Sequence, residues 1–252
     1  MPKRSKTESG TTPDAVRQKS IPVKDEIANH LRQGIEADLF TAEQTYALLK
    51  QIGQNADAIN QANFGALFGP LQLVLSNAVF LSVAKLFEKP KYPTRSIHSV
   101  LQLLERSSHE LVIEQRIVLL RRLAKAGMKD VKSLEKMPDP EITSRIVQFY
   151  KESLPSVELA SEMSKSLRAV VTRRNKVVAH NEMIDRSTLP QTSWAEIEQL
   201  MSYAKGFLVV VGVGYINMCY APDDGRPDYL VEDAQRSVRA LKRLLKKAGV
   251  QN

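Results

Sequence analysis

The chain has 252 residues, with 36 lysines and arginines against 28 aspartates and glutamates, and a formal net charge of +8. Its apolar fraction of 43% and charged fraction of 25% are ordinary for a globular protein that buries a sizeable core. The low aromatic content (6%) and only 11 glycines argue against a β-sandwich and against a glycine-rich nucleotide-binding fold. The basic charge permits a polyanionic partner such as nucleic acid, without identifying one.

Cys219 is the only cysteine, so an intrachain disulfide and a multi-cysteine zinc site are both excluded. This cysteine usage fits a reducing compartment. The basic residues after Met1 are not followed by the apolar core of a signal peptide. Two apolar stretches, 71–87 and 207–221, are interrupted by polar residues, and we interpret both as buried helices rather than membrane spans. We therefore expect a cytoplasmic protein without a membrane partner.

Residues 1–20 are polar and predict a disordered tail, and residues 21–252 predict a single all-α domain. From Val23 onward, apolar residues recur at helical spacing. Thr41, with Gln44 three residues later, has the pattern of a capping box and predicts the start of a second helix. The stretch 53–65 fits either a helix extension or a loop. The other expected helices cover about 64–87, 97–104, 111–126, 141–153, 156–180, 194–220 and 229–248.

Helix ends are marked in the second half of the chain as well. Gly127 and Gly249 are placed as helix stops, and Ser193 with Glu196 predicts a capping box. The valine-rich run 207–211 alone resembles a buried strand, but its capped start and the lack of a partner strand favour a helix. We find no internal repeat and no alternating strand pattern. The sequence predicts an all-α bundle of about eight helices.

The run Arg-Arg-Asn-Lys-Val-Val-Ala-His, residues 173–180, contains a charge at an unexpected place. Leu167, Val170, Val171 and Val178 share one apolar stripe of a predicted helix, and Arg174 lies in the middle of that stripe. An arginine on a packing face costs several kcal/mol unless it is paired or faces a wet cavity. We therefore treat this segment as the candidate site.

Arg174, Asn175 and His180 match an Arg-polar-x4-His pattern that resembles the motif of the HEPN superfamily of small α-helical proteins. The run Val-Ala-His-Asn is especially similar to the AbiU-type, abortive-infection branch of that superfamily. The resemblance implies a HEPN-like core with added helices and a metal-independent ribonuclease without a cofactor. It also implies a homodimer whose two motifs meet in one cleft, acting as a toxin or phage-defence effector. RNA and an antitoxin or regulatory protein are the implied partners.

These residue types suit RNA cleavage without a metal. A neutral imidazole titrates near physiological pH and can move the protons, so His180 is the candidate acid and base. A guanidinium can hold phosphate oxygens in pairs and offset developing charge, so Arg174 is the candidate phosphate clamp. Asn175 can orient the imidazole or donate to phosphate. As further substrate contacts we expect Arg173, Lys176 and Asn181.

Two alternatives remain open at this stage. In one continuous helix Arg174 and His180 lie about 120° apart, whereas Arg173 and His180 are separated by about 20°. Either the helix breaks or kinks before His180, or Arg173 is the phosphate contact. The second alternative concerns function: a non-catalytic RNA-binding or protein-interaction module would keep the HEPN fold and cleave nothing.

The remaining histidines, His30, His98 and His109, have no paired or metal-ligating spacing, and we interpret each as a core or surface residue. Asn77 is polar within the most apolar helix. It either satisfies a neighbouring helix end or lines a cleft beside Arg174.

We expect Lys85 and Glu88 to face solvent and Trp194 to belong to the core. The final helix has a basic face that is either simply solvated or guides RNA through salt-dependent contacts. Its basic residues are Arg236, Arg239, Lys242, Arg243, Lys246 and Lys247.

Overall fold

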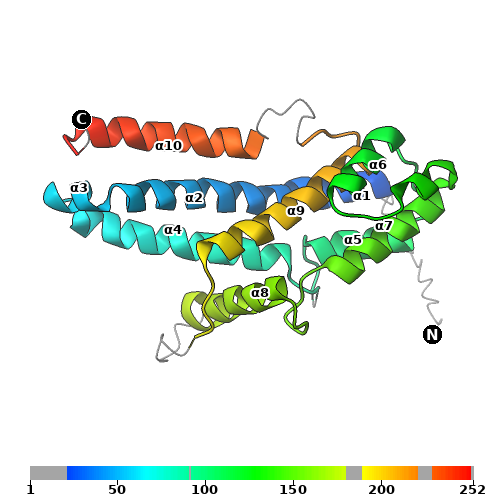
Figure 1. Ribbon diagram of the computed structural model, residues 1–252, viewed down its shortest axis with the longest axis horizontal. Helices are drawn as coiled ribbons and strands as arrows, with labels where there is room; N and C mark the ends of the chain where they lie inside the picture. The colour runs from blue at the N-terminus through cyan, green and yellow to red at the C-terminus, as the bar shows by residue number, and fades with distance from the viewer. Residues whose placement is uncertain (1–21, 91, 180–188, 221–228, 251–252) are drawn as a thin grey trace, which may run out of the picture.

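A computed structural model describes residues 22–90, 92–179, 189–220 and 229–250 (Figure 1). Those residues form helices and no strand, which confirms the predicted all-α class. Two π-helical turns, Leu31–Glu36 (η1) and Arg174–Ala179 (η3), and one 3-10 turn, Val131–Lys136 (η2), accompany the α-helices. The α-helices are α1 Val23–His30, α2 Ala37–Gln54, α3 Ala56–Gln61, α4 Gly65–Leu86, α5 Ile97–Arg106, α6 Arg116–Lys125, α7 Asp139–Ser153, α8 Glu162–Arg173, α9 Trp194–Tyr215 and α10 Tyr229–Lys247.

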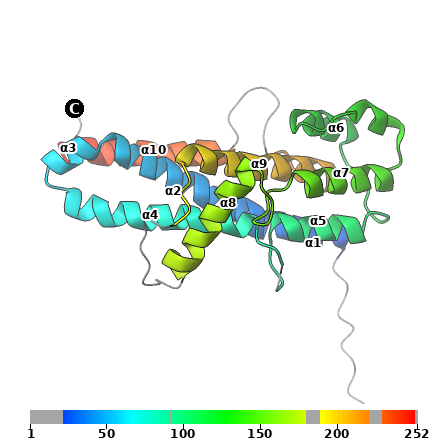
Figure 2. The ribbon, with the colours of Figure 1, turned by 60° about the horizontal axis from the view of Figure 1, so that its bottom comes forward.

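Four helices follow one another in the order α10, α2, α4 and α8, and α9 runs obliquely across α2 and α4 (Figures 1 and 2). The helices α5, α6 and α7 form the opposite end of the molecule from α3 (Figure 1). Helix α9 is the centre of the larger apolar core, and its buried residues include Phe207, Leu208 and Val211. A smaller cluster, which includes Ile52, Phe68 and Leu245, joins α2, α4 and α10 near α3. This order places α8 and α10 on opposite sides of the bundle.

The first helical segment runs without a break from Val23 to Gln54, because η1 links α1 directly to α2. The predicted capping box at Thr41 is therefore wrong. Thr41 lies inside α2, where its hydroxyl donates to the carbonyl of Ala37 (2.9 Å), and Gln44 donates to Ser237 of α10 (2.8 Å). A capping pattern predicts a start only where the chain is not already helical, and here the apolar stripe of α1 continues through η1.

Helix α4 is buried along only part of its length. Its C-terminal half contributes Val79, Phe80 and Val83 to the core, as predicted. Its N-terminal half exposes apolar side chains that the prediction placed inside, and those at Leu67, Leu71 and Val74 form one stripe, called the α4 ridge below. Of the helices described, α4 is also the one that is long and apolar enough to cross a membrane, a test that core helices of soluble proteins also pass.

The predicted caps of the later helices are confirmed. Ser193 accepts from the backbone of Glu196 (3.2 Å), and the Glu196 carboxylate accepts from the Ser193 backbone (2.6 Å), so α9 begins with a full capping box. Gly127 and Gly249 follow α6 and α10 with positive φ of 93° and 71°. The predicted core position of Trp194 is wrong: its side chain is 37% exposed and stacks on Tyr46.

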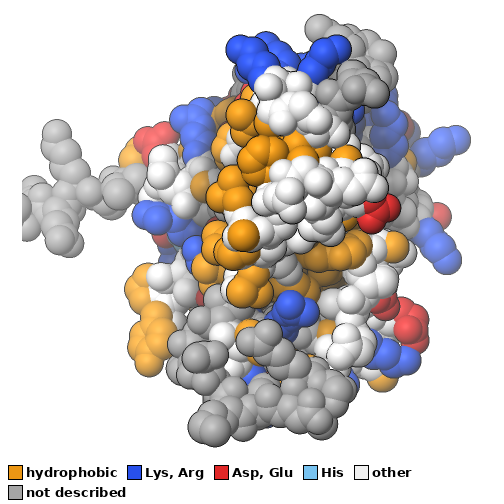
Figure 3. All heavy atoms as spheres, turned by 90° about the vertical axis from the view of Figure 1, so that its left-hand side faces the viewer, with side chains coloured by type: hydrophobic (Ala, Val, Ile, Leu, Met, Phe, Trp, Pro, Cys, Tyr) orange, Lys and Arg blue, Asp and Glu red, His pale blue; other side chains and the backbone are white. Residues whose placement is uncertain are grey.

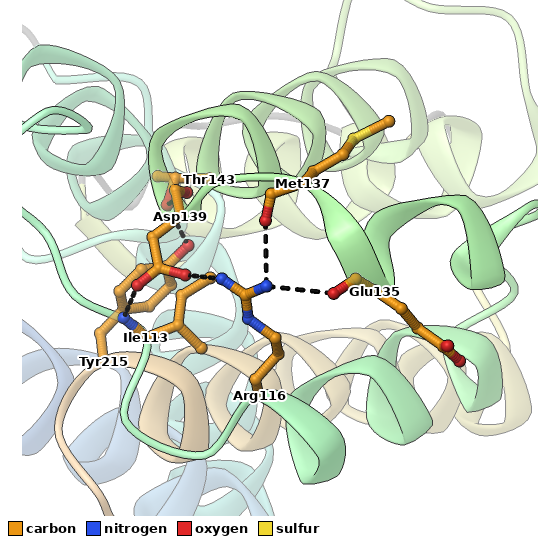
Figure 4. A network of polar contacts seen from close by, with 7 residues as sticks. All are labelled: Ile113, Arg116, Glu135, Met137, Asp139, Thr143 and Tyr215. Atoms are coloured by element: carbon orange, nitrogen blue, oxygen red, sulfur yellow. Dashed lines mark hydrogen bonds and ion pairs between the residues drawn. The ribbon is translucent and has the colours of Figure 1, made fainter.

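A polar network fixes the corner between α6, η2, α7 and α9 (Figure 4). Arg116 pairs with Asp139 and donates to the backbone carbonyls of Glu135 and Met137 (3.1 and 3.0 Å). Farther in, the buried hydroxyl of Tyr215 at the end of α9 donates to Thr143 of α7 (2.9 Å). The donors and acceptors in this network satisfy one another, and the contacts hold the ends of four elements together. We assign the network a structural role.

Candidate active site

The helix that carries the motif begins later than predicted. Ser161 caps α8 by accepting from the backbone of Ser164 (3.3 Å), so the expected start at Ser156 is wrong. Arg168 of α8 donates to the carbonyls of Val157 and Leu159 (3.0 and 3.1 Å). These contacts use carbonyls that a helix would need for its own hydrogen bonds. They hold the non-helical segment before α8 against that helix.

The α-helical geometry ends before His180. Helix α8 ends at Arg173, and Arg174–Ala179 forms the π-helical turn η3. A π-helical turn bonds residues five apart, so the α-helical projection that separated Arg174 from His180 does not apply across it. Such turns are rare and often occur at functional sites. His180 and Asn181 themselves lie outside the described residues.

Arg174 is the first residue of η3, and its charged side chain is only partly exposed. Its guanidinium Nη2 lies 3.2 Å from the Glu88 carboxylate Oε1 just beyond the end of α4, and the Arg174 side chain is 21% exposed. Its neighbours on the apolar stripe, Leu167 and Val170, are fully packed. The Nε atom of Arg174 is buried and has no hydrogen-bond partner among the described residues.

Arg174 lines a pocket of about 530 Å³ between the end of α4, the start of α5 and α8, called the Arg174 pocket below. A volume of this size suits a small ligand or one part of a larger one. The polar and aromatic side chains that line it are those of Phe87, Glu88, Lys89, Tyr92, Thr94, His98, Ser156, Glu158, Arg174 and Asn175. Asn175 is exposed and is the second motif residue in this pocket.

Charges in the Arg174 pocket are paired. Besides the Arg174–Glu88 contact, Lys89 donates to Glu158 at 2.6 Å. Burial, and to a smaller extent the charge of Lys89, lowers the pKa of His98 below its usual 6.5, while Glu158 opposes the shift. The His98 imidazole is therefore neutral at physiological pH and presents one donor and one acceptor.

Arg173 faces a different pocket. Its guanidinium carbon lies 4.4 Å from the centroid of the Phe80 ring, a cation–π distance. It lines a pocket of about 550 Å³ between α2, α4 and the start of α9, called the Arg173 pocket below, which is also lined by Trp194 and by Leu73, next to the α4 ridge. The two consecutive arginines of the motif therefore serve two separate pockets, and the structure brings Asn175 together with Arg174 and not with Arg173.

The other polar residues considered from the sequence have mixed positions. Lys176 is exposed and is not part of the Arg174 pocket. Asn77 does not line this pocket either; its side-chain oxygen is buried between helices without a hydrogen-bond partner among the described residues. Lys85 is exposed, as predicted, and lies 3.6 Å from Asp38. Glu88 does not simply face solvent, because it pairs with Arg174.

The sequence did not place the other residues of the pocket beside the motif, among them Glu88, Tyr92 and His98. These three come from the end of α4, the turn after it and the start of α5, which lie 76 or more positions before Arg174 in the chain. No local pattern links them to the motif. The only available signal was an aromatic residue between prolines in the turn, Pro90-x-Tyr92-Pro93.

No group of three or more histidine, cysteine, aspartate or glutamate side chains suitable for a metal occurs within the described ranges.

The described residues form an all-helical bundle in which Arg174 and Asn175 lie on a π-helical turn beside a pocket, in keeping with the HEPN resemblance of the sequence. The family model described as AbiU2, a HEPN family, matches residues 24–241. The chain belongs to this family, which is an abortive-infection branch of the HEPN superfamily. Comparison with curated proteins and with solved structures gave no match.

Proposed function

We propose that the chain is a metal-independent endoribonuclease. In the reaction, the ribose 2′ oxygen attacks the neighbouring phosphorus and the bond to the 5′ oxygen breaks. The products are a 2′,3′-cyclic phosphate and a 5′-hydroxyl. A base takes the proton of the 2′-hydroxyl, and an acid gives a proton to the leaving 5′ oxygen. The reaction therefore needs neither an oxidant nor a metal.

The observation that carries this proposal is the position of Arg174. A charged residue on an otherwise apolar stripe opens into a pocket, with Asn175 beside it and part of its hydrogen-bonding capacity unused. A preorganised guanidinium in a partly dehydrated site stabilises the charge of a pentavalent phosphorane. Asn175 supports the same phosphate, and His180 of the motif moves the protons. Membership of the AbiU2 family and the net charge of +8 support this assignment.

The proposed enzyme is a homodimer in the cytoplasm, and the α4 ridge is the surface that we assign to the second copy. Leu67 and Val74 are each 63% exposed, and with Leu71 they form an apolar stripe of the kind that marks contact surfaces. Figure 3 shows the apolar band that runs down this end of the molecule between basic side chains. The ridge adjoins the Arg173 pocket, so a second chain seated there brings Arg173 to the interface.

The test is RNA cleavage in EDTA by wild-type protein, Arg174→Ala, Asn175→Ala and His180→Ala, with Lys129→Ala as a surface control. We expect cleavage with cyclic-phosphate ends by the wild type and the control, and a loss of at least about a hundredfold in Arg174→Ala and His180→Ala. Equal cleavage by all variants, or none by the wild type on varied RNAs, contradicts the proposal. Growth arrest on expression that Arg174→Ala relieves supports a toxin role.

A second candidate function, RNA binding without cleavage, is favoured by α10. Its six basic side chains, named above, are all exposed, and the helix that carries them lies on the side of the bundle opposite α8 (Figure 1). Such a face binds polyanions in a salt-dependent and sequence-independent way. Replacing Arg239, Arg243 and Lys246 by glutamine separates the two functions. Loss of binding with unchanged cleavage of short RNAs assigns α10 to docking only, and binding without any cleavage supports this second candidate.

A further inference from the structure

Tyr92 is the most exposed large apolar side chain of the described residues, at 80%, and it lines the Arg174 pocket. Pro90 and Pro93 lie on either side of it in the sequence, and each proline fixes its own φ. The exposed tyrosine ring has little packing to explain it. It offers a flat face to a ligand that enters the pocket.

The inside of the pocket is electrically balanced. Glu88 and Glu158 neutralise Arg174 and Lys89 at 3.2 and 2.6 Å, so the pocket itself has little net charge. A free phosphate ion has to displace one of these carboxylates before a cation of the pocket can bind it. A neutral planar group with both donors and acceptors on its edge can bind without that displacement, since carboxylates accept hydrogen bonds from amino groups and guanidinium and ammonium groups donate to ring nitrogens and carbonyls.

Two polar atoms on side chains of the pocket wall are buried without a hydrogen-bond partner among the described residues: Nε2 of His98 and Nε of Arg174. Buried unpaired polar atoms are costly and call for an explanation. The lowered pKa of His98 keeps its imidazole neutral, so its two nitrogens offer one donor and one acceptor. Contact between a ligand edge and these buried atoms requires the two side chains to adjust on binding.

We propose that the Arg174 pocket binds one unpaired nucleobase, which stacks on Tyr92 while His98 and the pocket carboxylates contact its edge. The base comes either from single-stranded RNA or from a free nucleotide. Stacking on aromatic side chains is how proteins hold splayed-out bases, and base pairs in a duplex do not present this face. The link from this base to a cleaved phosphate beside Arg174 rests on the proposed ribonuclease function; the binding itself does not.

The experiment uses a single-stranded 2′-O-methyl oligoribonucleotide that contains 2-aminopurine. Its blocked 2′ oxygens prevent transesterification, and 2-aminopurine fluorescence falls when the base stacks. We expect quenching by the wild-type protein and binding weakened about tenfold or more by Tyr92→Ala, the loss expected for one base–aromatic contact. Tyr92→Phe keeps the ring and retains binding to within about twofold. His98→Ala weakens binding with less change in quenching, because the ring for stacking remains.

Two matched variants control for surface changes. Ile117→Ala removes an apolar side chain that is 76% exposed on α6, and His109→Ala removes an exposed imidazole; neither residue lines the pocket. Both should bind as the wild type does, with unchanged circular dichroism. Equal affinity of wild type and Tyr92→Ala, or equal binding of the duplex form, overturns the proposal.

Competition with adenosine, guanosine, cytidine and uridine monophosphates distinguishes the sources. Displacement of the oligonucleotide by a monophosphate, lost in Tyr92→Ala, assigns the pocket to free nucleotides. Binding of the oligonucleotide alone, also lost in Tyr92→Ala, assigns it to RNA. Tyr92-dependent binding by a protein that cleaves no RNA keeps this proposal and removes the ribonuclease. Cleavage of RNA by a protein whose binding does not depend on Tyr92 removes this proposal and keeps the ribonuclease.

Discussion

The Arg174 guanidinium lies 3.2 Å from the Glu88 carboxylate and joins the first residue of a π-helical turn to the residue just beyond the end of α4. In the proposed ribonuclease, the group that has to hold a phosphate is thus already engaged by a carboxylate. Both side chains are partly exposed, and ion pairs of this kind contribute only about 0–1 kcal/mol. A phosphate can therefore exchange for the carboxylate at small cost, and Glu88 weakens RNA binding while it holds Arg174 in place.

Glu88→Gln should increase RNA affinity. The substitution keeps the shape of the side chain and removes the charge that competes with phosphate, so we expect about two- to fivefold tighter binding at low salt. The plot of log Kd against log salt should become steeper, because one more cation is available to displace counterions. Filter binding of a 2′-O-methyl oligoribonucleotide at several salt concentrations measures both quantities.

Glu105→Gln is the control for this comparison. Glu105 pairs with Lys151 at 2.6 Å on the exposed surface of α5 and α7, away from the Arg174 pocket. It should leave affinity nearly unchanged. If Glu88→Gln binds RNA more weakly than this control, Glu88 orients Arg174 for its ligand and does not compete with it.

Val74→Asp should convert a dimer into monomers. Val74 is 63% exposed on the α4 ridge, so a carboxylate there costs the folded monomer little but is dehydrated in an apolar interface. Light scattering after size exclusion gives the mass: we expect twice 28.2 kDa for the wild type and 28.2 kDa for the variant. Val112→Asp, on an exposed loop residue outside the ridge, should remain dimeric. A monomeric wild type contradicts the assigned interface.

The fold was predictable where local rules decide the structure. The periodic apolar residues indicated the helices, and the Ser193–Glu196 pair marked the start of α9 because capping depends only on residues three apart. The same rule failed at Thr41, where η1 continues one helix into the next. Local patterns do not indicate a π-helical turn. Tertiary packing decides whether a helix ends at such a position or continues through a π-helical bulge.

The candidate site was predictable only in part for a related reason. Arg174 stood out because it breaks an apolar stripe, a feature within one helix. Its pocket partners Glu88, Tyr92 and His98 belong to other helices and a turn, and only the packing of α8 against α4 brings them together. The sequence also left Arg173 and Arg174 as alternatives, whereas the structure gives each arginine its own pocket.

Gly34→Ala should be strongly destabilising. Gly34 lies in η1, and a Cβ atom placed on it would be 2.4 Å from the carbonyl oxygen and 2.3 Å from the Cβ atom of Arg95. Backbone atoms cannot move aside easily, so we expect a loss of about 1–3 kcal/mol or more in the free energy of unfolding. Gly53→Ala is the matched control, because no atom lies within 4 Å of the added methyl group near the end of α2. Urea denaturation should show it gaining about 0.5–1 kcal/mol.

The stability of the protein should fall between pH 7.5 and pH 5.5. Burial lowers the pKa values of His98 and His30 in the folded state below 6.5. At pH values between each folded-state pKa and 6.5, the unfolded chain binds more protons than the folded protein does. The free energy of unfolding therefore increases with pH in this range. The neutral form is the stable folded form, and the contribution is complete above about pH 7.

Thermal unfolding at pH 5.5, 6.5 and 7.5 measures this dependence in wild type and in His98→Gln, whose amide keeps a neutral donor and acceptor in the Arg174 pocket. The variant should show a smaller fall in Tm toward pH 5.5, because it lacks a histidine that gains a proton on unfolding. His109→Gln, at a histidine that is mostly exposed, should keep the wild-type dependence. Glu196, whose pKa is lowered by its hydrogen bonds to Ser193, titrates below this range and does not confuse the comparison. A His98→Gln profile parallel to that of the wild type would show that His98 titrates alike in both states, and that the pocket leaves its imidazole as accessible to protons as in the unfolded chain.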